Sequence, residues 1–361
     1  MNSSKYISQS ALVIAFVVFC AIGFLASSVG VAQTVTPTAK PSPTASPTPE
    51  EDEGPIKIDT ELVNLSVRVV DRNNRPVNNL KESDFKVFED NIEQRIEFFS
   101  RLEVPTFYAL VIDNSGSLRM QLEKVIDASK VIIGTNRPED ETSVIRFISS
   151  DKIEITQDFT SEKGLLEDAL DNLYVEGGQT AITDAVYLAA QRVDDYQKKR
   201  DGGDRRRRAL ILVSDGEDRD SFYQEAQLFE LLRESDVQIY TIGFVGDLSN
   251  EGGFISKSPQ AKAKAYLERL SQETGGKAYF PKSIEELGGI ALDIAGELRT
   301  QYSIGYLPPN DKATDAYRAL RVTVADGPSK EKRIAITRTG IKYDASKGSA
   351  PTLQNTQQKR P

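Results

Sequence analysis

Oxygen-bearing side chains are concentrated in three short segments of the chain. The first segment is Asp113-Asn114-Ser115-Gly116-Ser117, the second is Gly177-Gly178-Gln179-Thr180, and the third is Ser214-Asp215-Gly216. Two carboxylates and several hydroxyl groups, completed by water, suit a hard divalent cation with roughly octahedral coordination, which favours Mg²⁺ or Mn²⁺ over Zn²⁺. If the fold brings these segments together, they form an oxygen-lined metal site.

The composition excludes several other kinds of chemistry. The 361 residues contain no histidine and a single cysteine, Cys20. A Ser-His-Asp or Cys-His nucleophile pair, a histidine general base, a Cys/His zinc site and an internal disulfide are therefore excluded. The 45 Lys and Arg residues are outnumbered by 54 Asp and Glu residues, so the formal net charge is −9. A chain with this charge is not expected to bind nucleic acid by neutralising phosphates.

The central part of the chain alternates between strand and helix patterns. Residues 107–112 form an apolar run that ends at Asp113, which is typical of a strand buried on both faces of a sheet. Further strands are predicted over 144–148, 153–159, 209–213, 239–244 and 278–280, and helices over 122–133, 161–172, 181–195, 222–235, 259–273 and 284–299. This alternation predicts an α/β fold with a doubly wound, mostly parallel sheet. Ligands of such sheets bind outside the carboxyl ends of the strands, where the first and third segments lie.

Strand patterns also flank this central part on both sides. They cover 62–69, 85–88 and 92–99 before it, and 302–306, 320–324 and 333–337 after it. Neither group has enough strands for a stable sheet of its own. We therefore expect residues 56–103 and 301–345 to pair into one small flanking β-sandwich domain, with the α/β domain of residues 104–300 inserted between them. The alternative is two separate β-elements that pack on the central domain.

The chain begins with the pattern of a secretory signal peptide. Lys5 precedes an apolar run over 11–25 and small residues up to Ala32, so we predict a signal peptide over 1–32 and export to the periplasm, the cell surface or the medium. An uncleaved anchor helix is the alternative, and only this alternative would attach the protein to a membrane. Residues 33–55 are rich in Thr, Pro and Ser and are predicted to form a disordered linker, and 346–361 a disordered tail.

The three oxygen-bearing segments, in this order on an α/β chain, resemble a von Willebrand factor type A domain and its metal-ion-dependent adhesion site. The resemblance covers about 104–300 and is specific because all three parts match. It implies that Mg²⁺, or Mn²⁺ or Ca²⁺, is held by Asp113, Ser115, Ser117, Thr180 and Asp215, and that an acidic residue of a partner protein completes the coordination. The β-rich flanks and the signal segment resemble exported bacterial proteins that contain such domains.

Simpler roles are open to several charged and polar residues. Asp113 and Thr180 could cap helices, and Asp184 is expected to complement the dipole of the helix that starts near residue 181. The acidic residues Glu217, Asp218 and Asp220 are expected to form a solvated loop rather than a second cation site. The basic run over 198–208 is expected to be an exposed loop before a buried strand rather than a docking patch.

Two alternatives to metal-dependent protein binding come from different functional classes. One is an envelope structural or assembly protein whose metal site has no function. The other is a Mg²⁺-dependent phosphohydrolase, because a strand-end aspartate beside Mg²⁺ also describes aspartate-nucleophile phosphatases. Those enzymes carry the motif Asp-x-Asp at the end of the first strand, whereas this chain has Ser115 at the position of the second Asp. The chain also has no Walker-type loop. We therefore predict no enzymatic activity.

Overall fold

The computed structural model describes residues 62–101, 103–199, 206–251, 257–308, 317–342 and 354–355. The predicted signal peptide and linker lie outside these residues, as does most of the predicted tail. The exception in the tail is β15 (Gln354–Asn355), which pairs with a strand of the central sheet, so a fully disordered tail is not what the structure shows. Among the described residues, no helix is long and apolar enough to cross a membrane.

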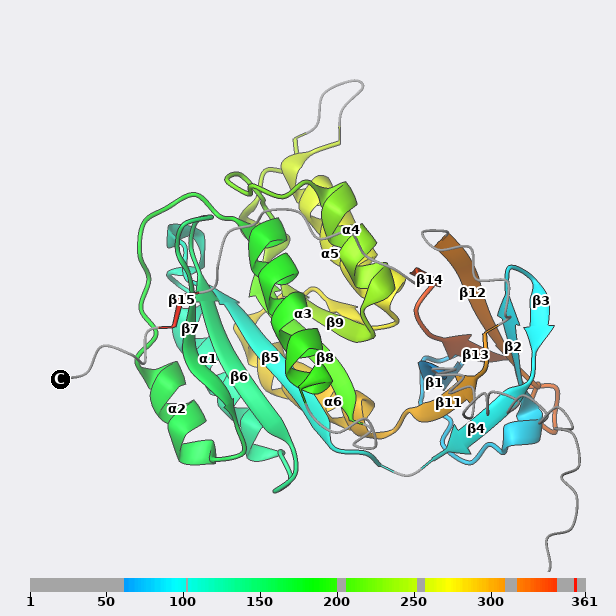
Figure 1. The fold of residues 1–361 in the computed structure, drawn as a ribbon. Helices are drawn as coiled ribbons and strands as arrows, with labels where there is room; N and C mark the ends of the chain where they lie inside the picture. The colour runs from blue at the N-terminus through cyan, green and yellow to red at the C-terminus, as the bar shows by residue number, and fades with distance from the viewer. Residues whose placement is uncertain are drawn as a thin grey trace, which may run out of the picture. The chain divides into compact units, whose positions relative to one another are not determined.

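A seven-stranded, mostly parallel sheet forms the centre of the fold (Figure 1). Its strand order is β10 (Ala278–Tyr279), β9 (Val237–Gly243), β8 (Arg207–Ser214), β5 (Thr106–Asp113), β6 (Glu141–Phe147), β7 (Ile153–Thr160) and β15. Strand β5 lies between β8 and β6, and all eight of its residues are buried. Within the sheet β7 is antiparallel to β6, and the other pairs are parallel. The carboxyl ends of β5 and β8 are therefore neighbours.

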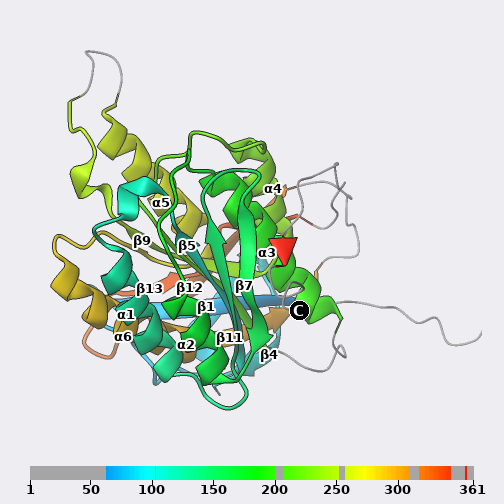
Figure 2. The same ribbon diagram turned by 90° about the vertical axis from the view of Figure 1, so that its left-hand side faces the viewer.

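Helices cover both faces of this sheet (Figure 2). Apolar residues of α1 (Leu122–Gly134), α2 (Lys163–Asp171) and α6 (Leu287–Arg299) pack with Tyr108, Leu110 and Ile112 of β5 on one face. Those of α3 (Ile182–Lys198), α4 (Glu225–Glu234) and α5 (Pro259–Thr274) pack with Ala109 and Val111 on the other. Successive residues of β5 thus enter opposite apolar cores, as the continuous apolar run predicts.

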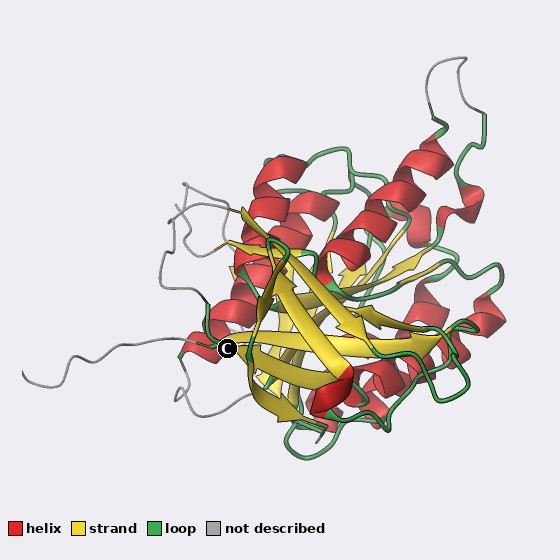
Figure 3. Ribbon diagram, turned by 90° about the vertical axis from the view of Figure 1, so that its right-hand side faces the viewer, coloured by secondary structure: helices red, strands yellow, loops and turns green. Residues whose placement is uncertain are grey.

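Two four-stranded antiparallel sheets form a β-sandwich beside this unit (Figure 3). One sheet has the order β13-β1-β11-β4 and the other β14-β12-β2-β3. Strands from before the central sheet therefore pair directly with strands from after it, and residues of both sheets share one apolar core. The bounds are β1 (Val63–Asp71), β2 (Phe85–Glu89), β3 (Ile92–Gln94), β4 (Ile96–Ser100), β11 (Tyr302–Tyr306), β12 (Tyr317–Val324), β13 (Arg333–Ile336) and β14 (Gly340–Lys342).

The predicted fold class, a mostly parallel α/β sheet with a flanking β-sandwich, is confirmed. Several elements differ from their predicted bounds, and two of these differences have a clear structural cause. The strand predicted over 92–99 is interrupted at Arg95, because β3 pairs within one sheet of the sandwich and β4 within the other. The helix predicted over 222–235 begins only at Glu225, because the backbone of the two residues after Ser221 is bound elsewhere, as shown below.

The chain enters and leaves the central sheet at the amino ends of its strands. Strand β4 leads into β5, and α6 leads into β11. Arg207, at the amino end of β8, donates hydrogen bonds to the backbone oxygens of Leu298 and Gln301. A buried ion pair of 2.8 Å joins Arg68 of β1 to Glu297 of α6. The connections to the sandwich therefore occupy the edge opposite the predicted metal site.

Candidate metal site

The site begins where β5 and β8 end side by side. Asp113 is the last residue of β5 and Ser214 the last of β8, and both side chains are fully buried. The Ser214 hydroxyl donates a hydrogen bond of 2.8 Å to Oδ2 of Asp113. The first and third segments are therefore in direct contact, as the strand-end argument predicts.

Two serine hydroxyls of the first segment lie next to this carboxylate. The backbone N–H of Ser115 donates to Oδ1 of Asp113 at 2.9 Å, which turns the chain into the short 3₁₀ helix η2 (Gly116–Leu118). The Oγ atoms of Ser115 and Ser117 are 2.8 Å apart. Because Ser115 is buried and Ser117 is exposed, the hydroxyl pair runs from the buried carboxylate toward solvent.

Hydrogen bonds link the loops that carry the three segments. The backbone oxygen of Thr180 accepts from the N–H groups of Arg219 at 2.8 Å and Asp220 at 3.2 Å, in the loop that follows the third segment. The Asn114 side chain of the first segment donates to the backbone oxygen of Tyr174 at 2.8 Å, in the loop that leads to the second. All three segments thus belong to one hydrogen-bonded group of loops.

Two glycines permit this close approach. A Cβ on Gly178 would lie 2.4 Å from Cγ2 of Ile148, so a side chain there would push the second segment away from the sheet. Gly216 has φ = 83°, a left-handed conformation that other residues adopt at a cost, and a Cβ there would lie 3.0 Å from Cβ of Ala263. Its neighbour Asp215 is buried and accepts a hydrogen bond of 3.0 Å from the N–H of Glu217.

The electrostatics of the site favour a cation. Burial and, to a smaller extent, the nearby Asp215 carboxylate together raise the pKa of Asp113 to about 6, although hydrogen bonds from Ser115 and Ser214 act to lower it. Among the described residues, neither Asp113 nor Asp215 forms an ion pair with Lys or Arg. Two buried carboxylates without a cationic side chain, next to neutral hydroxyls, fit a divalent metal ion.

The site does not depend on a cluster of acidic ligands. Within the described part of the chain, no group of three or more His, Cys, Asp and Glu side chains is arranged to hold a metal. The candidate site has two carboxylates, and its remaining oxygens are the hydroxyls of Ser115, Ser117 and Thr180. The cap roles considered for Asp113 and Thr180 are not seen, since α1 begins at Leu122 and Ala181 precedes α3.

Asp184 lies in the first turn of α3, as expected for a residue that complements the helix dipole, and it has a further role that the sequence did not indicate. This fully buried carboxylate accepts hydrogen bonds of 2.8 Å from the N–H groups of Phe222 and Tyr223, and one of 2.5 Å from the Ser150 hydroxyl. It therefore fixes the loop after β8 to the start of α3, four residues beyond Thr180, in addition to complementing the helix dipole. An Asp near the start of a predicted helix and an Asp-rich segment later in the chain are visible in the sequence, but they do not show which backbone groups this carboxylate binds.

The acidic loop is exposed at Asp218 and Asp220, as expected, but Asp218 also forms hydrogen bonds within the protein. Asp218 accepts hydrogen bonds from the hydroxyls of Thr183 and Ser221, so part of the acidic loop is fixed to α3. In the basic run, Arg207 is buried within β8, and Arg208 pairs with Asp194 at 2.9 Å and with Asp236 at 3.0 Å. The expectation of an exposed loop is therefore wrong for Arg207 and Arg208, because β8 begins earlier than predicted.

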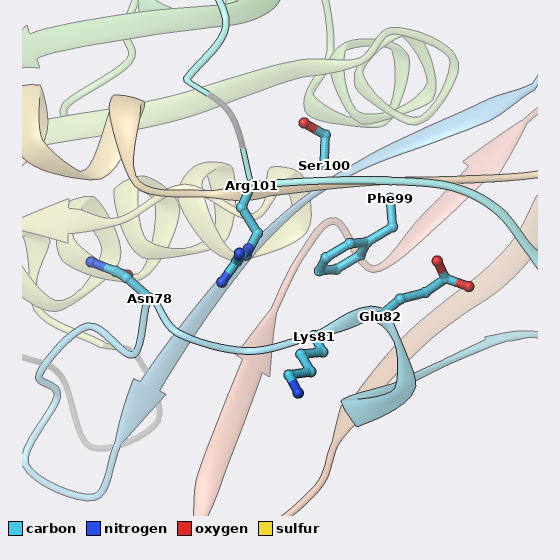
Figure 4. Close-up of a pocket in the computed structure, with 6 residues that line it drawn as sticks. All are labelled: Asn78, Lys81, Glu82, Phe99, Ser100 and Arg101. Carbon is cyan, nitrogen blue, oxygen red and sulfur yellow. The ribbon is translucent and has the colours of Figure 1, made fainter.

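A separate pocket of about 680 Å³ lies in the β-sandwich (Figure 4). Phe99 and Arg101, from β4 and the residue after it, point toward the segment that carries Lys81 and Glu82. The pocket is lined by Asn78, Lys81, Glu82, Phe99, Ser100 and Arg101. None of these residues belongs to the three oxygen-bearing segments, so the pocket is not part of the candidate metal site.

Replacing Asp113 by Asn tests how much the buried negative charge of this carboxylate destabilises the metal-free protein. Because folding raises the pKa of Asp113, the folded protein is more stable when this carboxyl group is protonated. This stabilisation is complete below the usual pKa of 3.8 and is lost as the pH rises through about 6. We expect the stability of Asp113→Asn relative to wild type to increase by up to about 3 kcal/mol between roughly pH 4 and pH 7. Urea denaturation in EDTA measures this difference, and a pH-independent difference would contradict the account.

Replacing Asp184 tests its role in holding the loop after β8. Asp184→Ala leaves the N–H groups of Phe222 and Tyr223 without their acceptor, so the variant should lose about 2 to 4 kcal/mol of stability. Hydrogen exchange should become faster at these two amides, while the amides of β8 remain protected. Asp184→Asn, which keeps one acceptor, should show a smaller change. Equal acceleration throughout β8 would instead indicate general unfolding.

Comparisons with known proteins bear on the fold and the family. The family model "von Willebrand factor type A domain" matches residues 109–292, which is just over half of the 361 residues. No curated protein matches the chain.

Several solved structures are similar to the chain over part of its length. A von Willebrand factor type A protein from Catenulispora acidiphila is 11% identical, with a TM-score of 0.44 over 84% of this chain and 76% of that one. An aerotolerance-related membrane protein from Bacteroides fragilis is 18% identical, with a TM-score of 0.40 over 54% of this chain and 98% of that one. Proximal thread matrix protein 1 from the mussel byssus, with a zinc-occupied MIDAS motif, is 19% identical, with a TM-score of 0.42 over 58% and 49%.

These likenesses to individual structures are too weak for a function to be transferred. The family match includes all three oxygen-bearing segments and the parallel sheet that positions them. The chain therefore belongs to the von Willebrand factor type A domain family.

Proposed function

We propose that the protein is a metal-dependent protein-binding module, in which a divalent cation at the ends of β5 and β8 binds an acidic residue of a partner protein. The observation that carries this proposal is the pair of buried carboxylates, Asp113 and Asp215, which have no cationic side-chain partner among the described residues. A site used only for structure would gain more from a lysine or arginine, or from apolar residues. In this site the negative charge of the two carboxylates is instead available to be neutralised by a bound metal ion.

The residues that would hold the ion are Asp113, Ser115, Ser117, Thr180 and Asp215. Mg²⁺ is the expected ion, with Mn²⁺ or Ca²⁺ as alternatives, because all the donors are oxygens. A bound divalent ion supplies an electrophilic centre that attracts a carboxylate. The chain contributes only two negative charges, and its hydroxyl donors are neutral, so the positive charge is not fully offset. Ser117 is exposed, which leaves this side open to a partner.

Two further parts of the proposal concern catalysis and location. We propose that the site binds without catalysing a reaction, because Ser115 occupies the position where phosphatases with a similar strand end carry a second carboxylate. Residues 1–32 support export of the protein to the periplasm, the cell surface or the medium. We also keep the domain boundaries at residues 104–300 for the metal-binding domain and 56–103 with 301–345 for the β-sandwich.

Thermal unfolding with and without millimolar Mg²⁺ or Mn²⁺ tests the metal part of the proposal. At about 100 times the dissociation constant, bound metal adds about 2.7 kcal/mol, which raises the midpoint by roughly 5 to 10 °C. The shift should be absent in Asp113→Ala and reduced in Thr180→Val. Asp127→Asn, on the exposed side of α1, is the matched control and should keep the full shift. The same shift in Asp113→Ala would contradict the proposed site.

The binding part is tested by capture of partners from an envelope or culture fraction on immobilised full-length protein. Partners should be retained in Mg²⁺, released by EDTA and not retained by Asp113→Ala. Proteins that stay bound in EDTA and bind Asp113→Ala equally well would favour the structural alternative, in which the metal site has no function.

A further inference from the structure

Exposed apolar side chains stand on the same loops as the proposed metal ligands. Met120 follows the first segment by three residues and is 80% exposed, and Phe222 follows the third by six and is 63% exposed. Tyr174, in the loop that leads to the second segment, is also exposed. A single exposed apolar residue is common on protein surfaces. Tyr174 packs against the Arg146 guanidinium, whereas Met120 and Phe222 are the exposed apolar residues on two loops that carry candidate ligands.

Phe222 is held in its exposed position by a rigid base. Its N–H is bound by Asp184, and its ring lies edge-on to Tyr223 at a centroid distance of 5.5 Å. Tyr223 is buried and stacks on Tyr187 of α3 at 3.7 Å. The Phe222 ring contacts this aromatic pair at one edge only and is otherwise exposed to solvent. Such a fixed aromatic side chain suits a contact with a partner.

The loops around the site carry more exposed acidic than basic side chains, because Arg119 on the first loop is outnumbered by three exposed aspartates. Asp218, Asp220 and Asp247 are exposed, and none of them forms an ion pair with Lys or Arg among the residues described. Asp220 accepts a hydrogen bond from the Ser150 N–H, and Asp247 accepts one from the Gln121 side chain. Glu217 is balanced by Arg219. A partner carboxylate that approaches the metal must therefore pass a negative rim, which opposes it unless a positive charge accompanies it.

We propose that the partner is a protein segment in which the metal-binding acidic residue is next to a Lys or Arg and a large apolar residue. The basic side chain would compensate the rim formed by Asp218, Asp220 and Asp247, and the apolar one would cover Phe222 or Met120. This inference rests on the proposed metal-dependent binding and adds the chemistry of the partner to it. According to this inference, segments that carry only acidic residues are not partners, although the metal ion alone could bind them.

Selection of a random peptide library displayed on phage tests this proposal directly. Full-length protein is immobilised, peptides are bound in Mg²⁺ and eluted with EDTA, and Asp113→Ala serves for counter-selection. We expect the eluted peptides to contain Asp or Glu within about three residues of Lys or Arg and of a large apolar residue, well above library frequency. At low salt, replacing that Lys or Arg by Gln in a selected peptide should weaken binding roughly two- to fivefold.

Variants of the protein distinguish the effect of the rim on peptide binding from that of the metal site. In Asp220→Asn/Asp247→Asn, the Lys-to-Gln change in the peptide should have little effect, and Phe222→Ser should remove the preference for the apolar residue. EDTA-sensitive peptides that contain acidic residues without enriched Lys or Arg would overturn this inference and leave the proposed function intact. If no peptide is retained in Mg²⁺, or if retention ignores EDTA and Asp113→Ala, the proposed function fails and this inference with it.

Discussion

Burial of two carboxylates at adjacent strand ends is the constraint on which the rest of the structure depends. Asp113 and Asp215 lie at the ends of neighbouring strands, and the pKa of Asp113 is raised to about 6 by burial and, to a smaller extent, by Asp215. The fold tolerates the unfavourable burial of these carboxylates because β5 is buried on both faces and is hydrogen-bonded to a strand on each side. Hydrogen bonds from Ser214 and Ser115 offset only part of it. A divalent cation would offset the rest, which explains why this position suits a metal-binding function.

The loops around these carboxylates are held by one another as well as by the sheet. Thr180 accepts from the loop after β8, Asn114 donates to the loop that leads to Thr180, and Asp184 binds the backbone at Phe222 and Tyr223. The loops that carry the three segments are therefore linked to one another by hydrogen bonds. The same contacts present Phe222 at the surface, so the rim and the candidate ligands are positioned by a single network. The connections to the β-sandwich lie at the opposite edge and leave the site open.

The fold could be predicted from the sequence because it depends on short, regular patterns, whereas the ligand set is implied by the resemblance to type A domains and stays a prediction. The apolar run before Asp113 fixes a buried strand, and strand ends in such a sheet meet at one edge, so the contact between Asp113 and Ser214 could be expected. The role of Asp184 could not be predicted, because the N–H groups that donate to its carboxylate lie 38 and 39 residues away in an irregular loop. The start of β8 was misplaced for a related reason: Arg207 is charged, and only its contacts with the backbone of Leu298 and Gln301 allow it to be buried.

The most direct test of the central claim is to locate Mn²⁺ in crystals of the full-length protein by anomalous diffraction. We expect one strong peak between the ends of β5 and β8, within coordination distance of Asp113 and of the Ser115 and Ser117 hydroxyls. We expect this peak to be absent in Asp113→Ala. A peak confined to the loop of Asp218 and Asp220, or none beside Asp113 at saturating Mn²⁺, would contradict it.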